Sequence, residues 1–571
     1  MHGSMWRREE TRPVGYAARS RRLPPTLPRP VGDRAAAPDG GCRTNPGPSE
    51  QIKRLRGMAM NFLECDREQA FLMPPDPRDW LPEGHLAWFV LASVEQMDLS
   101  AFLAVYRRDG WGRAAFEPSM MVSLLLYAYA RGERSSRGIE RKCVEDVAYR
   151  VIAAQQKPDH ATIARFRARH ADALAELFSS VLGLCKEAGL VKVGVIAIDG
   201  TKVHANASHH SNLDYEQLAR EIIKEASEID AAEDELYGDA RGDELPEHLQ
   251  TREGRRAALA EAKQKLEHER SEKAEAAAEA EALEVKIELD SEVIVPRIQG
   301  RDGWLLEARR QLDEHRRREA KPIVRPRAER LLEAERRMAQ DLEVERLANE
   351  AYEHYRAHGR DSQGRRLGRP PKPFKPPETP AGKINTTDPD SRNVKTPRSY
   401  TQGYNGQAVV NEEQIVLAAE VSASSPDFGH LEPMVKATKR ELQAVGVTET
   451  PGVAVADSGY WNEEQMDNVV ANEHVQVLIP PDAGKRGTPR PGWHGGRYTS
   501  MRDTLQTDYG GGLYRRRKVM VEPVFAQTKH NRRINQFLRR GRSAARSEWR
   551  LITATHNLLK LHKHQTALAA A

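Results

Sequence analysis

The chain has 571 residues, of which 30% are charged and 39% hydrophobic, and its formal net charge is +5. Its four cysteines stand far apart, which argues against a disulfide framework and against a zinc site with closely spaced ligands. No apolar run is long enough for a membrane span, and the N-terminus lacks the apolar core of a secretory signal, so we expect a cytoplasmic protein of about three or four domains.

The first segment, residues 1–57, is rich in Arg, Pro and Gly and has no apolar periodicity. Such a composition predicts disorder, because it cannot bury enough apolar surface to fold. Met58 and Met60 directly precede the first patterned segment, so an over-extended gene start is a second interpretation.

Residues 58–190 have helical periodicity and are expected to form a helical N-terminal domain. The run FEPSMMVSLLLYAYARG has Pro118 near its start and Gly132 after its end, and a further helix is expected over Arg137–Ala153. In HATIARFRARH, one helix face is apolar and the other basic: Ile163 and Phe166 against Arg165, Arg167, Arg169 and His170. Short helices ending in a basic one suit a helix-turn-helix-like DNA-binding domain, and a bundle with a solvated basic face explains the pattern equally well.

Residues 191–212 begin a catalytic core, and residues 213–383 interrupt it. VGVIAIDGTKVHAN predicts a buried strand, a tight turn at Gly200 and a second strand segment. The insertion is dominated by Glu, Arg, Ala, Lys and Leu, which predicts charged, coiled-coil-like helices that Pro296, Pro322 and Pro326 interrupt, followed by a Pro-rich linker at 360–383. We expect an arm that serves self-association or DNA-end contacts, and a solvated spacer is the alternative.

Residues 384–571 have mixed α/β patterning. QGYNGQAVVN and QIVLAAEVSAS predict a hairpin joined at Glu412 and Glu413. Further along the chain we expect a helix in HLEPMVKATKRELQAVG, a strand in GVAVADSGY, a helix in NEEQMDNVVANEH, a strand in VQVLIPP, a loop over 482–512, and helices over Val519–Lys529 and Ser543–His562. With the insertion left out, this is the element order of an RNase H-like core, so the fold class is α/β.

Two aspartates follow buried strands. Asp199 ends VIAID and Asp457 ends VAVAD, and carboxylates at strand ends lie where open α/β sheets place ligands. Mg²⁺ prefers oxygen ligands, and two such ions (Mg²⁺ or Mn²⁺) about 3.5–4 Å apart would serve an in-line phosphoryl displacement. Either aspartate alone is more often a turn or helix cap, so the combination carries the argument.

Glu522 is the third acid. Pro523 directly after it predicts a first helical turn, since proline has no N–H to donate from a helix interior. That position favours an ionised carboxylate, and Lys529, seven residues on, would lie on the same helix face.

These segments together resemble bacterial insertion-sequence transposases of the DDE class, with an InsH-like N-terminal domain and a transposase DDE domain. The matching segments are DREQAFLMPPDPRDWLPEGHLAWFV, IAIDGTKVHANAS, NTTDPDSRNVKTPRSYTQGYNGQAVV, VADSGYWNEE and YRRRKVMVEPVFAQTKHNRRINQFLRRG. Related transposases carry a Tyr-x₂-Arg-x₃-Glu-x₆-Lys signature, and Glu522 and Lys529 fit its second half. In its first half Lys518 takes the arginine position, whereas Tyr514 and Arg517 each stand one residue early.

The resemblance implies cleavage and strand transfer at the ends of an insertion sequence. Asp199, Asp457 and Glu522 would be the catalytic and metal-binding acids, and the partner would be double-stranded DNA bound by a homo-oligomer in the bacterial nucleoid. The DNA-binding candidates, basic or aromatic, are Arg517, Lys518, Lys529, Arg532, Arg533 and Trp461. A nuclease without strand transfer, or an inactive DNA-binding relic, are the alternatives.

Overall fold

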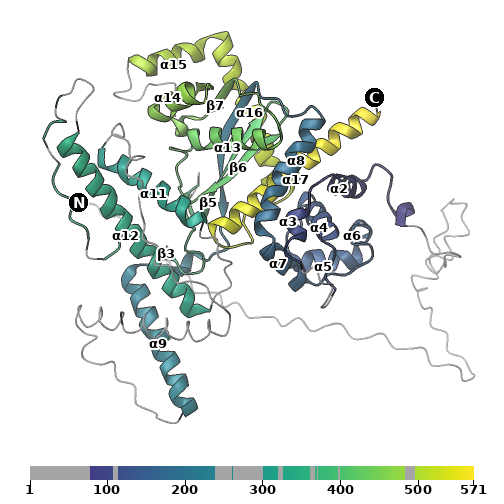
Figure 1. Ribbon diagram of the computed structural model, residues 1–571, viewed down its shortest axis with the longest axis horizontal. Coiled ribbons are helices and arrows are strands. Elements are labelled where there is room, and N and C mark those ends of the chain that lie inside the picture. Colours follow the sequence, from purple (N-terminus) through teal and green to yellow (C-terminus); the bar gives the residue numbers. More distant parts are fainter. Residues whose placement is uncertain are drawn as a thin grey trace, which may run out of the picture. The chain divides into compact units, whose positions relative to one another are not determined.

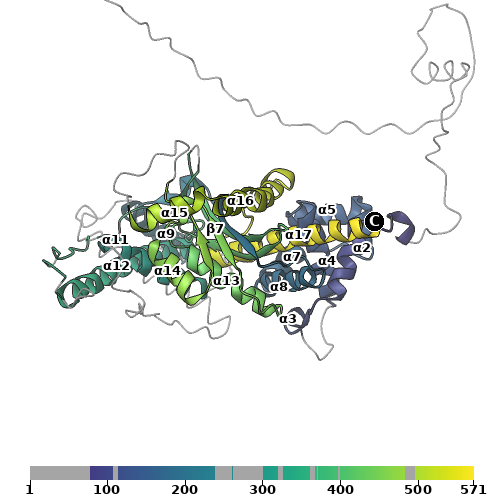
Figure 2. The same ribbon diagram turned by 90° about the horizontal axis from the view of Figure 1, so that it is seen from above.

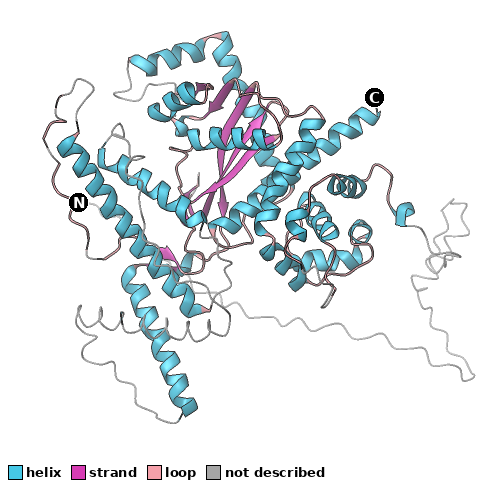
Figure 3. Cartoon of the chain, in the orientation of Figure 1, coloured by secondary structure: helices cyan, strands magenta, loops and turns pink. Residues whose placement is uncertain are grey.

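The computed structural model describes residues 77–106, 114–237, 300–318, 326–359, 365–482 and 495–570, apart from single positions between 366 and 398, and also Ala260. The predictions for residues 1–57, Pro296 and Pro322 lie outside these residues. Helices, one mixed sheet and a separate pair of short strands make up the regular structure of the described residues (Figure 3). None of its helices combines the length and apolar character that a membrane span requires.

The described residues between Pro77 and Glu187 form a series of helices. Its elements are η1 (Pro77–Trp80), α2 (Leu86–Glu95), α3 (Ser100–Leu103), α4 (Pro118–Ala130), α5 (Ser136–Glu145), α6 (Val147–Ile152), α7 (His160–Arg169) and α8 (Ala171–Glu187). As expected, α4 starts at Pro118 and is followed by Gly132, which has a positive φ of 80°. Nearly every side chain of α4 is buried, so this helix forms the centre of the segment.

Two details of this segment differ from the sequence prediction. The single helix expected over Arg137–Ala153 is wrong, because Asp146 is extended and its carboxylate accepts hydrogen bonds from Ala148 and Tyr149, which starts a new helix, α6. The continuous basic face expected on α7 is also wrong. Arg167 is buried, and it donates to the carbonyl of Arg134 over 2.7 Å.

The sheet is mixed, and its central strand is β1 (Val195–His204). The other strands are β4 (Arg392–Lys395), β5 (Tyr400–Asn411), β6 (Val416–Ser422), β7 (Val453–Ala456) and β8 (Gln476–Leu478). On one side of β1 lies antiparallel β5, which pairs in turn with β4 and β6; on the other side lie β7 and β8, both parallel to β1. The hairpin expected at Glu412 and Glu413 is confirmed as β5 and β6.

The tight turn expected at Gly200 is wrong, because β1 continues through it. Gly200 pairs with Gln407 of β5, and the pairing extends from Ile196 to His204. A Cβ at Gly200 would lie 2.4 Å from Oδ1 of Asp427 and from Nε2 of Gln407. The glycine is therefore required by close packing on one face of the sheet and not by a turn.

Helices cover both faces of the sheet. α13 (Leu431–Ala444) packs against β5 and β6, and α14 (Glu463–Asn472) packs against α13 and β8. α16 (Asp508–Ala526) packs against β1, β5 and β7, and α17 (Arg542–Ala570) packs against β6. In Figures 1 and 2, α17 runs from the sheet along α8 to α4, so the C-terminal helix joins the sheet to the N-terminal helices.

The insertion forms helices where it is described. These are α9 (Tyr215–Tyr237), α11 (Gly300–Arg318) and α12 (Arg327–His358). The two ends of the insertion are joined by a short antiparallel strand pair, β2 (Asn212–Leu213) with β3 (Ile384–Asn385). Small apolar clusters hold α9 and α11 against α12, for example Leu218 with Leu331 and Ala308 with Val344.

The loop expected over 482–512 is wrong for its described part. α15 (Gly496–Gln506) and the start of α16 occupy residues 496–512, and the Thr507 side chain caps α16 by accepting from Gly510 N. The glycines at 510–512 suggested a loop, but a Cβ on Gly510 would lie 2.1 Å from the carbonyl oxygen of Thr504. Glycine is thus what lets the two helices meet so closely.

Candidate active site

Asp199 and Asp457 come from neighbouring parallel strands. In the register of β1 and β7, Ile198 pairs with Ala456, and the two aspartates are the next residues along each strand. β7 ends there and β1 continues, so the side of β1 beyond Asp199 has no β7 partner. The sequence prediction that these two acids meet at one edge is consistent with this register.

The Asp199 carboxylate is held by two donors. Its Oδ1 accepts from the N–H of Gly200 over 2.8 Å, and its Oδ2 accepts from Nη1 of Arg517 over 2.6 Å. Burial raises the pKa of Asp199 to about 6; the charge of Arg517 opposes this shift and that of Asp457 adds to it. Asp457 also caps the turn after β7 by accepting from the N–H of Gly459.

A third aspartate, Asp427, lies close to this pair and was missed by the sequence reasoning. Its Oδ1 accepts hydrogen bonds from Lys202 Nζ, Asn405 Nδ2 and Gln407 Nε2 at 3.1, 2.8 and 2.9 Å. These partners and Gly200 are on the sheet face opposite to Asp199, since alternate residues of a strand point to opposite faces. The only sequence signal was an acid in the connection between β6 and α13.

Glu522 lies elsewhere than predicted. The expectation that it starts a helix is wrong, because α16 runs from Asp508 to Ala526 and contains Pro523 in its interior. Proline cannot donate to the carbonyl of Val519, and Gln414 Nε2 donates to that carbonyl instead, over 2.8 Å. The Glu522 side chain is exposed and makes no hydrogen bond or ion pair with any described residue, whereas Arg517 is the α16 residue in contact with Asp199.

Lys529 does reach the strand that carries Asp199. Its Nζ donates to the carbonyl of Lys202 over 2.7 Å, and burial lowers its pKa. It lies in a π-helical turn (Gln527–Asn531) after α16. Because a π-turn changes the helical register, the seven-residue spacing does not place Lys529 on the same face as Glu522.

The remaining DNA-binding candidates differ in exposure. Lys518 and Arg533 are exposed, so both are available to a phosphate backbone. Arg532 is 5% exposed and donates to the Ile552 carbonyl and to Thr555, which fastens the π-turn to α17. Trp461 is also 5% exposed and stacks on Tyr498, so burial favours the core interpretation over base stacking.

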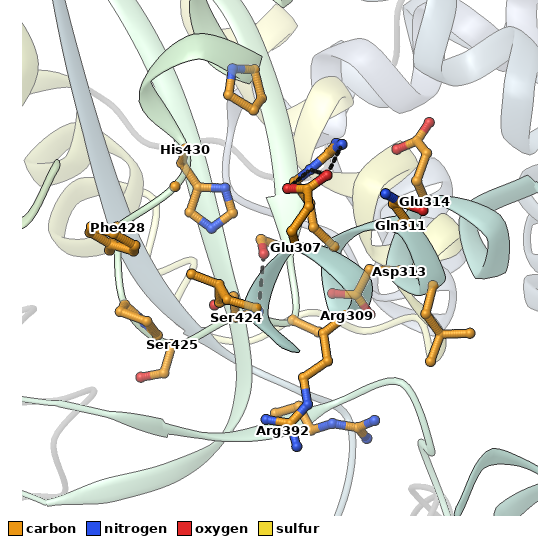
Figure 4. Close-up of a pocket in the computed structure, with 18 of the residues that line it drawn as sticks. Glu307, Arg309, Gln311, Asp313, Glu314, Arg392, Ser424, Ser425, Phe428 and His430 are labelled. Atoms are coloured by element: carbon orange, nitrogen blue, oxygen red, sulfur yellow. Dashed lines mark hydrogen bonds and ion pairs between the residues drawn. The ribbon is translucent and has the colours of Figure 1, made fainter. Parts of the chain in front are cut away.

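A groove of about 2120 Å³ lies between the arm and the sheet's α13 face. Figure 4 shows side chains of α11, among them Glu307 and Asp313, on one side, and the connection with Phe428 and His430 on the other. The groove reaches Ser458 and Gly459 beside the acid pair. Acidic residues outnumber basic ones in its lining, so it does not suit a DNA backbone.

The acid pair fits a divalent cation of the Mg²⁺ type. Mg²⁺ often takes only one or two carboxylates and completes its shell with water and substrate phosphate. Asp199 already has a cationic group, the Arg517 guanidinium, on the oxygen that a metal ion would bind. No group of three or more His, Cys, Asp or Glu side chains is arranged to hold a metal ion within the described ranges.

Comparison with known proteins gives two matches to families. Residues 75–169 match a transposase domain (DUF772), and residues 483–562 match a transposase DDE domain. No curated protein and no solved structure matches the chain. The DDE match contains Glu522 and Lys529, whereas Asp199 and Asp457 lie outside both matches. The two matched domains support the resemblance found in the sequence, which is to insertion-sequence transposases of the DDE class.

Proposed function

We propose that this transposase cleaves DNA at the ends of an insertion sequence and joins those ends to a target by metal-dependent phosphoryl transfer. The observation that carries the proposal is the side-by-side placement of Asp199 and Asp457 on parallel β1 and β7, with Arg517 against them. Strand order supports an RNase H-like core: β1, the β5–β6 hairpin, a helix, β7 and then α16 follow in the expected order once the arm is left out.

In this proposal Asp199 and Asp457 hold the metal, and Glu522 is the third acid. A bound Mg²⁺ would polarise the scissile phosphate and activate the attacking hydroxyl or water. Asp199 and Asp457 are held by backbone N–H groups of Gly200 and Gly459, so their carboxylates are oriented in advance. Lys529, whose Nζ lies beside β1 on the carbonyl of Lys202, is proposed to contact DNA next to the acids.

The triad is tested by three isosteric substitutions: Asp199→Asn, Asp457→Asn and Glu522→Gln. Each removes the charge that a metal needs and keeps the shape, so end cleavage should fall by at least about 100-fold while affinity for DNA stays near wild type. Asp467→Asn is the matched control, since Asp467 is an exposed acid on α14 that pairs with Arg497.

Cleavage by an Asp199 or Asp457 variant at the level of the control would remove the acid pair from the proposal. Cleavage by Glu522→Gln at the level of the control would remove only Glu522 from the proposal. Such a result would agree with the exposure of the Glu522 side chain on α16. Gel-shift affinity measured on the same samples separates loss of chemistry from loss of DNA binding.

The N-terminal helices are proposed to bind the element ends, and the helical arm to associate with another protomer. The arm is fastened to the core by charged pairs, such as Arg392 with Asp341 and Arg337 with Asp390, and by small apolar clusters. Replacing residues 213–355 by a short flexible linker should leave the core folded and weaken oligomers in sedimentation. Equal association of the deleted and full chains would contradict a role for the arm in self-association.

A further inference from the structure

Arg517, on α16, forms an ion pair with the carboxylate of Asp199. Nη1 of Arg517 lies 2.6 Å from Oδ2 of Asp199, and the two side chains are only 12% and 17% exposed. A half-buried carboxylate beside a second acid, Asp457, is stabilised by a cation, and in this structure that cation belongs to the protein itself. Arginine is suited to this because its guanidinium stays charged at every physiological pH.

The same guanidinium has a donor that the protein does not use. Nε of Arg517 is buried and has no hydrogen-bond partner among the described residues. A buried N–H without an acceptor is destabilising, and such groups are rare in folded proteins. A guanidinium that donates to a carboxylate through one nitrogen, and whose other N–H has no acceptor, can still bind an oxyanion.

A divalent cation and the Arg517 guanidinium compete for one oxygen. At 2.6 Å from Oδ2 the guanidinium nitrogen fills the position that a metal ligated by Asp199 would take. Lys518, the next residue on α16, is exposed, so it does not compete for this oxygen.

We infer that Arg517 is a displaceable counter-ion of Asp199, which moves off the acid when metal binds and then binds a phosphate of the DNA backbone beside the acid pair. This inference rests on the proposed function, because it takes Asp199 as a metal ligand. It makes metal binding and phosphate binding reciprocal: whichever occupies the site first raises the affinity for the other.

The test measures Mn²⁺ binding to the DNA-free protein by calorimetry, so it does not depend on activity. In Arg517→Gln the competing cation is gone, and Mn²⁺ affinity should rise by about ten-fold or more, the effect of losing one charged hydrogen bond. Arg515→Gln is the matched control: it removes the same charge from an exposed position on the same helix and should change the affinity by less than about two-fold. Arg517→Lys keeps a charge and serves as a second variant if Arg517→Gln unfolds.

The DNA arm of the experiment uses a short labelled duplex with and without Mn²⁺. Wild type and Arg515→Gln should bind the duplex more tightly with Mn²⁺, and Arg517→Gln should lose that difference. If Mn²⁺ affinity is unchanged or weaker in Arg517→Gln while Asp199→Asn abolishes Mn²⁺ binding, the inference is overturned and the proposed function stands. If Asp199→Asn binds Mn²⁺ like wild type, the proposed metal site itself is wrong.

Discussion

The buried pair of Arg134 and Glu548 ties the N-terminal helices to the C-terminal helix, and its removal should destabilise the whole described unit. Arg134 follows α4, and its Nη1 lies 2.7 Å from Oε1 of Glu548 on α17, with side chains 9% and 0% exposed. Oε2 of Glu548 accepts from the backbone N–H groups of Leu538 and Arg539. One carboxylate therefore satisfies donors from both regions that match transposase families.

Glu548→Ala would leave the guanidinium and two backbone N–H groups without this acceptor inside the protein. Breaking a buried ion pair from one side typically destabilises by about 3–5 kcal/mol, and we expect a loss of this size. Urea unfolding followed by tryptophan fluorescence measures it, since Trp549 is buried next to Glu548. The double variant Arg134→Met with Glu548→Leu is the control, because an apolar pair of similar volume restores much of the stability.

A loss of less than about 1 kcal/mol for Glu548→Ala, the range of exposed ion pairs, would refute this reasoning. The reasoning would also be refuted if the double variant were as unstable as Glu548→Ala. The loss of stability would then not come from the unpaired Arg134.

Three further predictions concern Gly200, Asp199 and Asp388. Gly200→Ala should lower Mn²⁺ affinity and cleavage, because its Cβ would overlap Oδ1 of Asp427; wild-type values for both would contradict this. Mn²⁺ affinity should rise as pH increases through about 6 and level off above it, because Asp199 must lose its proton to bind metal. Calorimetry at several pH values measures this, and an affinity that does not change with pH would contradict the prediction. Burial raises the pKa of Asp388 to about 7, so its stabilising contribution is present at low pH and lost as pH rises through that value; the unfolding free energy of Asp388→Asn should vary less with pH than that of wild type.

The neighbouring placement of Asp199 and Asp457 could be predicted because each acid directly follows a short buried apolar run. VIAID and VAVAD are apolar enough to indicate central strands, and parallel neighbours bring their ends together without further information. The sequence did not reveal which face each acid would use. That depends on β1 continuing through Gly200, where it pairs with residues of β5 that lie about 200 positions away in the chain.

The errors have a common origin in tertiary packing. Pro523 indicates a helix start by local rules, but Gln414 from the β5–β6 connection supplies the donor that the proline lacks, and α16 continues through it. Arg532 belongs to a basic run that predicts a DNA-binding surface, yet three oxygens of the π-turn and α17 accept from it in the interior. Local propensity cannot anticipate a partner contributed by a distant segment.

The measurement that tests the central claim most directly is strand transfer with DNA that carries the element's own ends. Wild-type protein with Mg²⁺ should cleave the ends and join them to a target plasmid, Asp199→Asn and Asp457→Asn should do neither while still binding the ends, and Asp467→Asn should match wild type. Cleavage without joining by the wild type would indicate a nuclease instead of a transposase. Joining by either aspartate variant at the wild-type rate would contradict the active site proposed for β1 and β7.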